Sequence, residues 1–439
     1  MNKPLLYDLD CDFSTLCAYR RLYIGFSGGL DSTVLLHLIT QQPTLKSKVI
    51  AIHVNHHIQD CADEWQTHCQ QVCTTLGIKL ITESCLLTDS QQKGNIEAHA
   101  REARFNCFSK HVKSNDLLLL AHHQQDQAET LLLRLLKGSG PSGLAAIKSY
   151  TVLHGMNVYR PLLKTAKQLI KSYAKKNALN WVEDPSNQQI DLQRNYLRNK
   201  ILPLLKEEFG DIVTTLNRSA ALCLEQNIYV NKKIEPIFNK LQVSPEQLQL
   251  PAFQLLEEFE KKIVLRMWLT QHDLRLPSAA KLSDFIVALS IAAKDKNPRL
   301  AQKNYVIQRY QDKLYLYQPS SARLQDKIIW FPPYPPINLP GLNLTITLEP
   351  ASREQANLYL HTCLPITISH RLGGEVICYR NQSKSVKKLL QEMQIPPWQR
   401  EKLLLVSDNT QLISIEDKLI SDSFDTETNN FLLAFTKLC

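Results

Sequence analysis

The sequence has no long hydrophobic run and no secretion signal. Its longest apolar stretches, such as Leu117–Ala121, are far shorter than the roughly 20 residues that span a bilayer. The first residues, MNKPLLYDLDCDF, carry three aspartates and lack the basic and apolar regions of a signal peptide. We therefore expect a cytoplasmic protein that has no membrane partner.

The sequence also has no paired cysteine motif. Its 11 cysteines are an odd number, spread from Cys11 to Cys439, and none forms a CxxC pair. Cys69 and Cys73, with three residues between them, come nearest to the spacing of metal ligands. Scattered cysteines in a cytoplasmic chain indicate reduced thiols in the core, in preference to disulfides or a metal cluster.

The length and charge of the chain favour several folded domains and a polyanionic partner. At roughly 100–200 residues per domain, 439 residues correspond to two to four domains. Hydrophobic residues make up 44% and charged residues 21%, as in ordinary globular proteins. The 51 Lys and Arg exceed the 42 Asp and Glu, which gives a net charge of +9.

The first part of the chain has the pattern of an α/β fold. Short apolar runs alternate there with amphipathic stretches, which is typical of a parallel sheet with helices on both faces. The expected strands are Leu22–Phe26, Val49–Val54, Ile78–Thr82 and Asp116–Ala121.

We expect three domains and one linker. A catalytic domain would span residues 1–210, and a mostly helical middle domain 211–330, because only helical periodicity follows Leu192 up to Ala293. Five prolines in FPPYPPINLPG (331–341) block helix and central strand alike, so an extended connector is expected there. Residues 342–439 mix β-like alternation with one helix, Ser385–Met393, and would form a small α+β domain.

A glycine loop follows the first predicted strand and precedes a helix. Free N–H groups at such a helix start bind anions, and glycine lets a phosphate approach the backbone. The spacing fits neither the P-loop nor the dinucleotide fingerprint. A carboxylate in a phosphate loop repels the ligand unless a divalent cation lies between them, so Asp31 is a predicted Mg²⁺ ligand. The residues expected to hold phosphates are those of SGGLDS: Ser27, Gly28, Gly29, Leu30, Asp31 and Ser32.

This loop resembles the SGGxDS loop of the ATP-pyrophosphatase family. Members of that family cleave ATP between the α and β phosphates and adenylate a substrate. The resemblance implies ATP as cofactor and a Rossmann-like fold of the adenine nucleotide alpha hydrolase type. It also implies an adenosine contact at the end of the second strand, where HVNHHIQ begins with His53.

Further segments resemble the tRNA(Ile)-lysidine synthetase family over nearly the whole chain. That family's order is matched by NIEAHAREARF (95–105), AHHQQDQAETLLLRLLKGSGPSGL (121–144), RPLL (160–163), WVEDPSN (181–187) and RNYLRN (194–199). The resemblance implies that ATP adenylates the C2 oxygen of the wobble cytidine in the isoleucine tRNA with a CAU anticodon. Free L-lysine would then displace AMP to give lysidine.

The candidate catalytic residues lie on two predicted helices. Asp126 and Glu129 are three positions apart, so they share one helix face at the carboxyl edge of the sheet. Glu129, with Asp126, would bind the lysine ammonium and accept a proton. Arg101 and Arg104 lie on the other helix, and either could stabilise charge on the α-phosphate.

The chain departs from the family's pattern at two positions. Asn55 stands where the family commonly has aspartate, and Gln125 where it often has a second acid. Metal ligation is therefore assigned to Asp31 alone.

Basic residues gather in two stretches. Ten Lys and Arg stand against three acids from Arg160 to Lys206, and Lys164, Lys167, Lys171 and Lys175 recur at helical spacing. This stripe predicts contacts with RNA phosphates. The second stretch, Arg371–Lys402, resembles the family's C-terminal domain, which contacts the tRNA acceptor arm. Within it, Pro396, Pro397 and Trp398 are expected to pack.

Two alternatives remain open. One is a tRNA thiolation enzyme with the same ATP loop, although related enzymes carry CxxC pairs that this chain lacks. The other is a non-catalytic ATP-binding, RNA-binding protein, which would release no pyrophosphate when tRNA is added. The sequence also leaves open whether the chain is a monomer or a homodimer.

Overall fold

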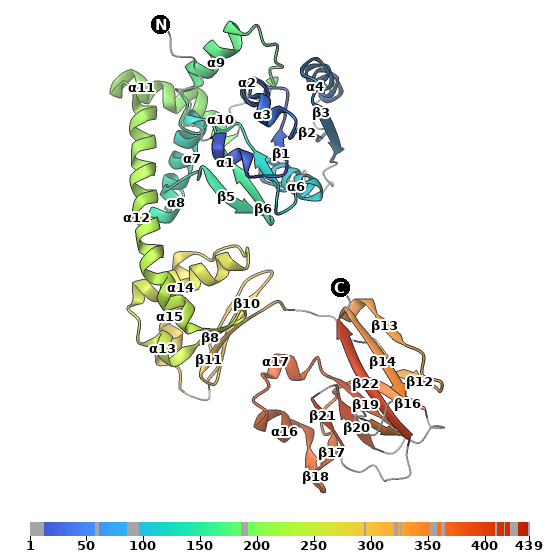
Figure 1. The fold of residues 1–439 in the computed structure, drawn as a ribbon. Coiled ribbons are helices and arrows are strands. Elements are labelled where there is room, and N and C mark those ends of the chain that lie inside the picture. The colour runs from blue at the N-terminus through green and yellow to red at the C-terminus, as the bar shows by residue number, and fades with distance from the viewer. Residues whose placement is uncertain are drawn as a thin grey trace. The chain divides into compact units, whose positions relative to one another are not determined.

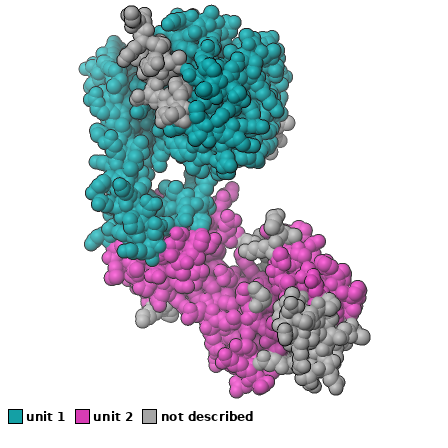
Figure 2. Space-filling view, in the orientation of Figure 1, with its two compact units in different colours: residues 1–240, 257–276 teal, residues 241–256, 277–439 magenta. Residues whose placement is uncertain are grey.

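The chain divides into two compact units, which Figure 2 colours separately. One unit comprises Met1–Lys240 and Glu257–Leu276, and the other comprises Leu241–Leu256 and Pro277–Cys439. No helix in the described part of the chain is long and apolar enough to cross a membrane. The computed structural model describes residues 13–57, 61–85, 96–185, 192–293, 296–319, 324, 326–350, 358–360, 365–408, 411–416, 418–421 and 429–437.

The first unit is built on a six-stranded sheet of order β3-β2-β1-β4-β6-β5. All neighbours are parallel except β5 and β6, which form a hairpin. The four strands expected from the sequence are confirmed within a few residues, whereas the hairpin was not predicted. The strands are β1 (Leu22–Gly25), β2 (Val49–Asn55), β3 (Lys79–Ser84), β4 (Leu117–Leu119), β5 (Tyr150–Leu153) and β6 (Met156–Tyr159).

Helices cover both faces of this sheet, which confirms the expected fold class (Figure 1). Side chains alternate along β1, so that Leu22 and Ile24 enter one core and Tyr23 enters the other. The first core is shared with α2 (Leu30–Thr40), α4 (Ala62–Leu76) and α9 (Lys167–Lys176), and the second with α6 (Ile96–His111).

Shorter and longer helices complete the first unit. Apart from the last residue of α12, which lies across the boundary, they are α1 (Phe13–Cys17), α3 (Pro43–Lys46), α7 (Gln124–Leu136), α8 (Pro141–Leu144), α10 (Gln193–Tyr196), the π-helix η3 (Leu197–Ile201), α11 (Leu202–Phe209), α12 (Ile212–Leu241) and α14 (Glu258–Gln271). Leu131 of α7 and Ala220 of α12 share a small core, so α12 is fixed beside α7.

The described cysteines are free, and only part of them are the core thiols that the sequence predicts: Cys69, Cys73 and Cys107 are buried, whereas Cys17 is exposed. Cys69 and Cys73 are fully buried in the core beneath α4. Burial raises the pKa of each thiol to about 12, so both remain protonated.

The second unit begins with an antiparallel sheet of order β7-β8-β11-β10-β9. The sequence predicts only helices in much of this region, because β7 and β8 are three residues long, too short for their alternation of polar and apolar residues to indicate a strand. The elements here are β7 (Gln242–Ser244), β8 (Gln247–Gln249), α13 (Leu250–Gln254), α15 (Ala279–Ile291), β9 (Arg299–Ala301), β10 (Val306–Tyr310) and β11 (Lys313–Tyr317).

The C-terminal part of this unit contains two further sheets, of order β12-β16-β19-β20-β21 and β13-β14-β22-β15, and a β17–β18 hairpin. The strands are β12 (Ile328–Trp330), β13 (Ile337–Leu339), β14 (Leu344–Pro350), β15 (Leu358–Leu360), β16 (Ile366–His370), β17 (Val376–Tyr379), β18 (Gln382–Ser385), β19 (Leu404–Ser407), β20 (Leu412–Ile415), β21 (Leu419–Ile420) and β22 (Asn429–Lys437). A 3-10 turn, η4 (Pro340–Leu342), and two helices, α16 (Val386–Glu392) and α17 (Pro397–Arg400), accompany them. The predicted helix and β-like runs are confirmed here.

The proline-rich segment 331–341 is not a free connector. Tyr334 is only 4% exposed and packs in the same core as Trp330. The indole of Trp330 donates a hydrogen bond to the Pro335 carbonyl at 2.8 Å, and β13 pairs with β14. The prolines exclude helix, as expected, but the aromatic residues between them have an apolar core to enter. The segment therefore belongs to the C-terminal fold.

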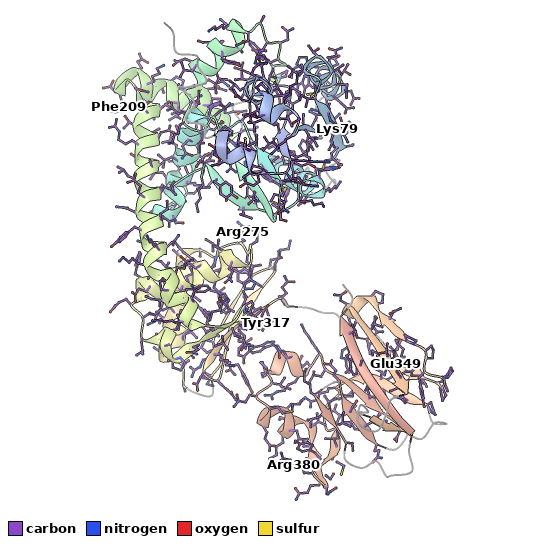
Figure 3. The ribbon with its side chains drawn as sticks, viewed as in Figure 1. Lys79, Phe209, Arg275, Tyr317, Glu349 and Arg380 are labelled. Carbon is purple, nitrogen blue, oxygen red and sulfur yellow. The ribbon has the colours of Figure 1, made fainter. Side chains whose placement is uncertain are left out.

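Trp398 packs, as its sequence context predicts. Its ring stacks on Tyr317, labelled in Figure 3, with centroids 4.8 Å apart and an interplanar angle of 8°. It also meets Tyr310 and Tyr315 edge-on. Arg400 donates a 2.7 Å hydrogen bond to the Tyr310 hydroxyl. These contacts join the β10–β11 hairpin to α17 within the second unit.

The burial of the proline-rich segment predicts that Trp330→Ala is strongly destabilising. It removes a 3% exposed indole and its hydrogen bond, and should lower the free energy of unfolding by roughly 3–5 kcal/mol. Phe331→Ala next to it is the matched control, because Phe331 is 60% exposed and should change stability by less than about 0.5 kcal/mol. Urea unfolding measures both. If Trp330→Ala changed the free energy of unfolding as little as Phe331→Ala is expected to, the segment would again be interpreted as a linker.

Candidate functional site

The phosphate loop has the geometry of an anion site. The chain leaves β1, turns through Ser27 and Gly28, and enters α2 with Gly29 as its N-cap. Gly28 has a φ of 80°, and a Cβ there would lie 2.9 Å from Cys69 Sγ, so only glycine fits. The Ser32 hydroxyl donates to the Gly29 carbonyl at 3.0 Å and braces the turn. The N-terminus of α2, beginning at Leu30, is therefore available for an anion.

Asp31 lies in the first turn of α2 and has two basic side chains, Lys167 and His123, beside it. The Lys167 ammonium lies 2.6 and 2.8 Å from its two carboxylate oxygens. His123 Nε2 lies 3.6 Å from Oδ2. Burial opposes ionisation of Asp31, but His123 and Lys167 together hold its pKa below the ordinary value. Asp31 is therefore a carboxylate, as a cation ligand must be.

Lys167 departs from the predicted RNA-facing stripe. Its ammonium is ion-paired with Asp31, whereas Lys164, Lys171 and Lys175 are exposed. Helical spacing predicts which residues share a face, but it does not show that one long side chain pairs with a carboxylate that is distant in sequence.

Asp126 and Glu129 lie together on the first turns of α7, as their spacing predicts. Asp126 Oδ2 accepts the backbone N–H of His123 at 2.9 Å, and His123 Nδ1 accepts the N–H of Gln125 at 3.2 Å. His123 and Asp126 thus form a capping box at the start of α7, and Asp126 has a structural role as well as a candidate chemical one.

Two arginines that sequence reasoning did not assign to the site bind both carboxylates. Arg194 donates to Glu129 and Asp126, each at 2.8 Å. Arg198 donates to both oxygens of Glu129, at 2.6 and 2.9 Å, and to Asp126 at 3.3 Å. The i,i+4 spacing within RNYLRN puts both guanidinium groups on one helix face, and this spacing was the available signal. Their carboxylate partners, 65 or more positions away, left no signal of their own.

The charges of this network shift the pKa values of Asp126, Arg194 and Arg198 in the directions that keep these three groups ionised. Burial opposes the charge of Asp126, but His123 and Arg194 lower its pKa to about 2. Burial likewise opposes the charges of Arg194 and Arg198, yet the two carboxylates raise the pKa of both guanidinium groups. Glu129 is fully buried, whereas the side chain of Asp126 is 12% exposed. Asp126 is thus the member of the pair that a ligand can reach.

His123 joins the phosphate loop to the carboxylates. Its Nε2 lies 3.6 Å from Asp31 Oδ2 and 3.5 Å from Asp126 Oδ2, and the residue is only 2% exposed. One imidazole therefore lies between the loop's carboxylate and the α7 carboxylate pair. The two predicted halves of the site are one continuous set of polar contacts.

The histidines at the end of β2 lie in different environments. His53 is 5% exposed, and its Nδ1 is 3.0 Å from the Phe26 carbonyl, directly before the loop. Burial lowers the pKa of His53, so it is neutral. Burial, together with Arg104, lowers the pKa of His56 to about 4. The amide of Asn55 donates to Asp63 at 3.0 Å, a structural contact.

The structure separates the two candidate arginines of α6. Arg104 is close enough to His56 to lower its pKa, which puts it near the end of β2. Arg101 lies near the residues that follow β4 and β6. Burial is the main cause of the lowered pKa of His122 and of Arg160, and the charge of Arg101 contributes to both. Both arginines are exposed. Glu97 precedes Arg101 by four residues, a spacing at which the two could form an ion pair, but its side chain lies outside the described ones.

The residues present fit a magnesium ion that shares its ligands with phosphate. The described residues contain no cluster of three or more His, Cys, Asp or Glu that could hold a metal alone. Mg²⁺ commonly binds one or two carboxylates and completes its shell with water and substrate phosphates. Asp31, an ionised carboxylate in an anion loop, is a donor of that kind.

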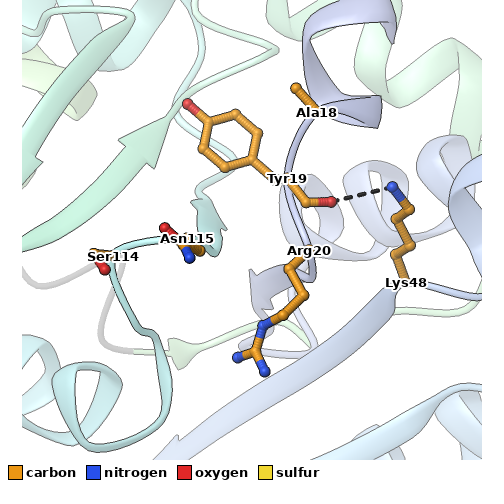
Figure 4. Close-up of a pocket in the computed structure, with 6 residues that line it drawn as sticks. All are labelled: Ala18, Tyr19, Arg20, Lys48, Ser114 and Asn115. Atoms are coloured by element: carbon orange, nitrogen blue, oxygen red, sulfur yellow. Dashed lines mark hydrogen bonds between the residues drawn. The ribbon is translucent and has the colours of Figure 1, made fainter.

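A hollow at the opposite edge of the sheet is separate from this site (Figure 4). It has a volume of about 440 Å³ and is lined by Ala18, Tyr19, Arg20, Lys48, Ser114 and Asn115. These residues precede β1, β2 and β4, so they mark the amino ends of the parallel strands. The candidate site lies at their carboxyl ends, where α/β proteins bind ligands.

The lowered pKa of Asp126 predicts a pH-dependent contribution to stability. Its pKa is about 2 when folded and near 3.8 when unfolded, so its stabilisation is present above about pH 4 and is lost as the pH falls toward 2. Asp126→Asn should cost roughly 1.5–3 kcal/mol at neutral pH. Urea unfolding from neutral pH down to about pH 3 should show this difference shrinking. Exposed Asp284→Asn is the control, and a difference independent of pH would contradict the assignment.

Three models of known protein families match separate parts of this chain. A PP-loop domain model matches residues 10–205, a TilS substrate binding domain model 248–315, and a TilS substrate C-terminal domain model 366–433. The match to the first model contains the loop, His123 and both arginines of the network.

Full-length relatives match along nearly the whole chain. The tRNA(Ile)-lysidine synthase of Legionella pneumophila (strain Lens) is 36% identical over 414 residues, which are 93% of this chain and 93% of that protein. The tRNA(Ile)-lysidine synthase of Haemophilus influenzae (strain 86-028NP) is 36% identical over 93% of this chain and 97% of its own length. Because relatives at this identity match 93% of its length, the chain belongs to the tRNA(Ile)-lysidine synthase family.

Proposed function

We propose that this chain joins free L-lysine to C2 of the wobble cytidine in the isoleucine tRNA with a CAU anticodon, at the expense of ATP. One observation carries the proposal: His123 lies between Asp31 of the phosphate loop and Asp126 of the α7 pair. A nucleotide held by the loop and an amine held by the carboxylates would thus meet in one place. AMP and pyrophosphate are the other products.

The phosphate loop serves the first step. The cytidine C2 oxygen attacks the α-phosphate of ATP, pyrophosphate leaves, and the oxygen becomes part of an AMP ester that an amine can displace. The backbone of Ser27–Ser32 binds the departing phosphates at the N-terminus of α2. Bound Mg²⁺ would neutralise phosphate charge beside Asp31. Buried His53 holds the backbone before the loop on the adenosine side.

The carboxylate–arginine network serves the second step. A free lysine amine has a pKa of about 10.4 and arrives protonated, so it needs a carboxylate that binds it and takes a proton. Asp126, with a 12% exposed side chain, is the less buried member of the pair and is better placed to meet the ammonium. Glu129, which the sequence favours for this role, is fully buried, and its ion pairs hold Arg194 and Arg198 in place. Arg101, beside His122, faces the same strand ends and would stabilise charge on the α-phosphate.

The order of the two steps gives the sharpest test. Enzyme, tRNA and ATP labelled at the α-phosphate, without lysine, should release pyrophosphate and leave label on the RNA. Lysine should then discharge labelled AMP. A transcript with uridine at the wobble position is the control and should remain unlabelled. Asp31→Asn should abolish the first step, because it removes the charge that faces the cation.

The competing chemistry predicts the opposite dependence. If the lysine carboxylate were adenylated, pyrophosphate exchange would need lysine and no tRNA. That result would contradict the proposed mechanism.

The exposed lysines of the α9 region should contact RNA phosphates. Replacing Lys164, Lys171 and Lys175 by Gln should lower the slope of log K against log salt by up to about three, one unit for each phosphate contact. Filter binding of tRNA at several salt concentrations measures the slope. An unchanged slope would show that this face meets only solvent.

A further inference from the structure

Lys167 occupies the position beside the phosphate loop that a bound cation would need. Its ammonium contacts both Asp31 oxygens at 2.6 and 2.8 Å. Lys167 is the first residue of α9, where the helix dipole disfavours a positive charge, and the first turn of α9 contains no acidic residue. The helix itself therefore does not favour a lysine at this position, whereas the ion pair with Asp31 does.

The helix holds the backbone of Lys167 fixed while its side chain remains able to move. Ile170 and Tyr173 of α9 are buried in the core that α2 shares. The Tyr173 hydroxyl also lies 2.9 Å from His37 Nδ1 on α2. The Lys167 side chain is 37% exposed and Asp31 29%, so solvent and ligands reach the ion pair. A four-carbon side chain on a fixed helix can exchange one anion for another without moving the backbone.

The balance of charges indicates when Lys167 would exchange Asp31 for a phosphate. An unpaired Asp31 would repel a polyphosphate, and Lys167 neutralises it when no nucleotide is bound. A divalent cation that arrives with ATP would satisfy Asp31 and displace the ammonium. The displaced ammonium would then lie beside phosphate oxygens, which lysine binds well as a point charge.

We propose that Lys167 is a polyphosphate-binding residue, paired with Asp31 in the nucleotide-free chain and released to the β- and γ-phosphates when the cation of MgATP takes Asp31. The proposal rests on the function proposed above, because it requires ATP in this loop. Lys167 and the cation would then hold the leaving pyrophosphate together. A divalent cation without nucleotide must compete with Lys167 and should bind weakly.

Binding measurements on the full-length protein test this exchange. Lys167→Met removes the charge and keeps the length of the side chain, and Lys167→Arg keeps the charge. Lys176→Met is the matched control, because Lys176 is exposed at the other end of the same helix. Calorimetry measures the affinity for ATP with Mg²⁺, and electron paramagnetic resonance measures the binding of Mn²⁺ alone. Melting temperatures report folding, and Lys167→Gln, which can still donate to Asp31, replaces the Met variant if that variant unfolds.

The expected outcome is a loss and a gain in the same variant. Lys167→Met should bind ATP with Mg²⁺ roughly tenfold to hundredfold more weakly and bind Mn²⁺ alone more tightly. Lys167→Arg should retain most of the ATP affinity, and Lys176→Met should match the wild type in both assays. Unchanged affinity of Lys167→Met for either probe, with the wild type binding ATP, overturns this proposal alone. Failure of the wild type to bind ATP overturns the proposed function and this inference with it.

Discussion

A buried network of two carboxylates and two guanidinium groups determines the geometry of the site. Glu129 is fully buried, and its charge is tolerable only because Arg194 and Arg198 surround it. Asp126 receives the same two arginines, caps α7 and faces His123. If one member is removed, its partners keep their charges without compensation in a poorly solvated place. The positions of the other site residues therefore depend on this balance.

The network also joins parts of the chain that are distant in sequence. Each pair links α7 to α10 or to the π-helix η3 across 65–72 positions. Short π-helical turns are rare in proteins, and those that occur are often found at functional sites. Arg198 lies on this one, and Arg194 one turn before it on α10. Both guanidinium groups can thus reach the first turns of α7, which the parallel sheet fixes at its carboxyl edge. The sheet positions one half of the network, and ion pairing positions the other.

The sequence predicts local features well and distant pairing poorly. The strands around the glycine loop and the shared face of Asp126 and Glu129 follow from spacing within a few residues, and the structure has both. Arg194 and Arg198 were visible only as part of a family-like segment, because no local pattern shows which acid a distant arginine meets. Pro332 to Pro336 correctly exclude helix, yet composition could not show that Tyr334 between them enters a core. Lys167 was assigned to the RNA-facing stripe because periodicity gives a face and leaves the partner open.

The position of α9 follows from the same balance of charges. Its apolar side packs on α2, directly behind the phosphate loop, and its first residue neutralises Asp31. Its exposed side carries Lys171 and Lys175. One short helix therefore presents charge to the loop at one end and to solvent along its length. If the exposed lysines contact tRNA as proposed, RNA bound there would rest on the helix whose packing fixes the loop. ATP and tRNA would then be held by two helices, α2 and α9, that share one core.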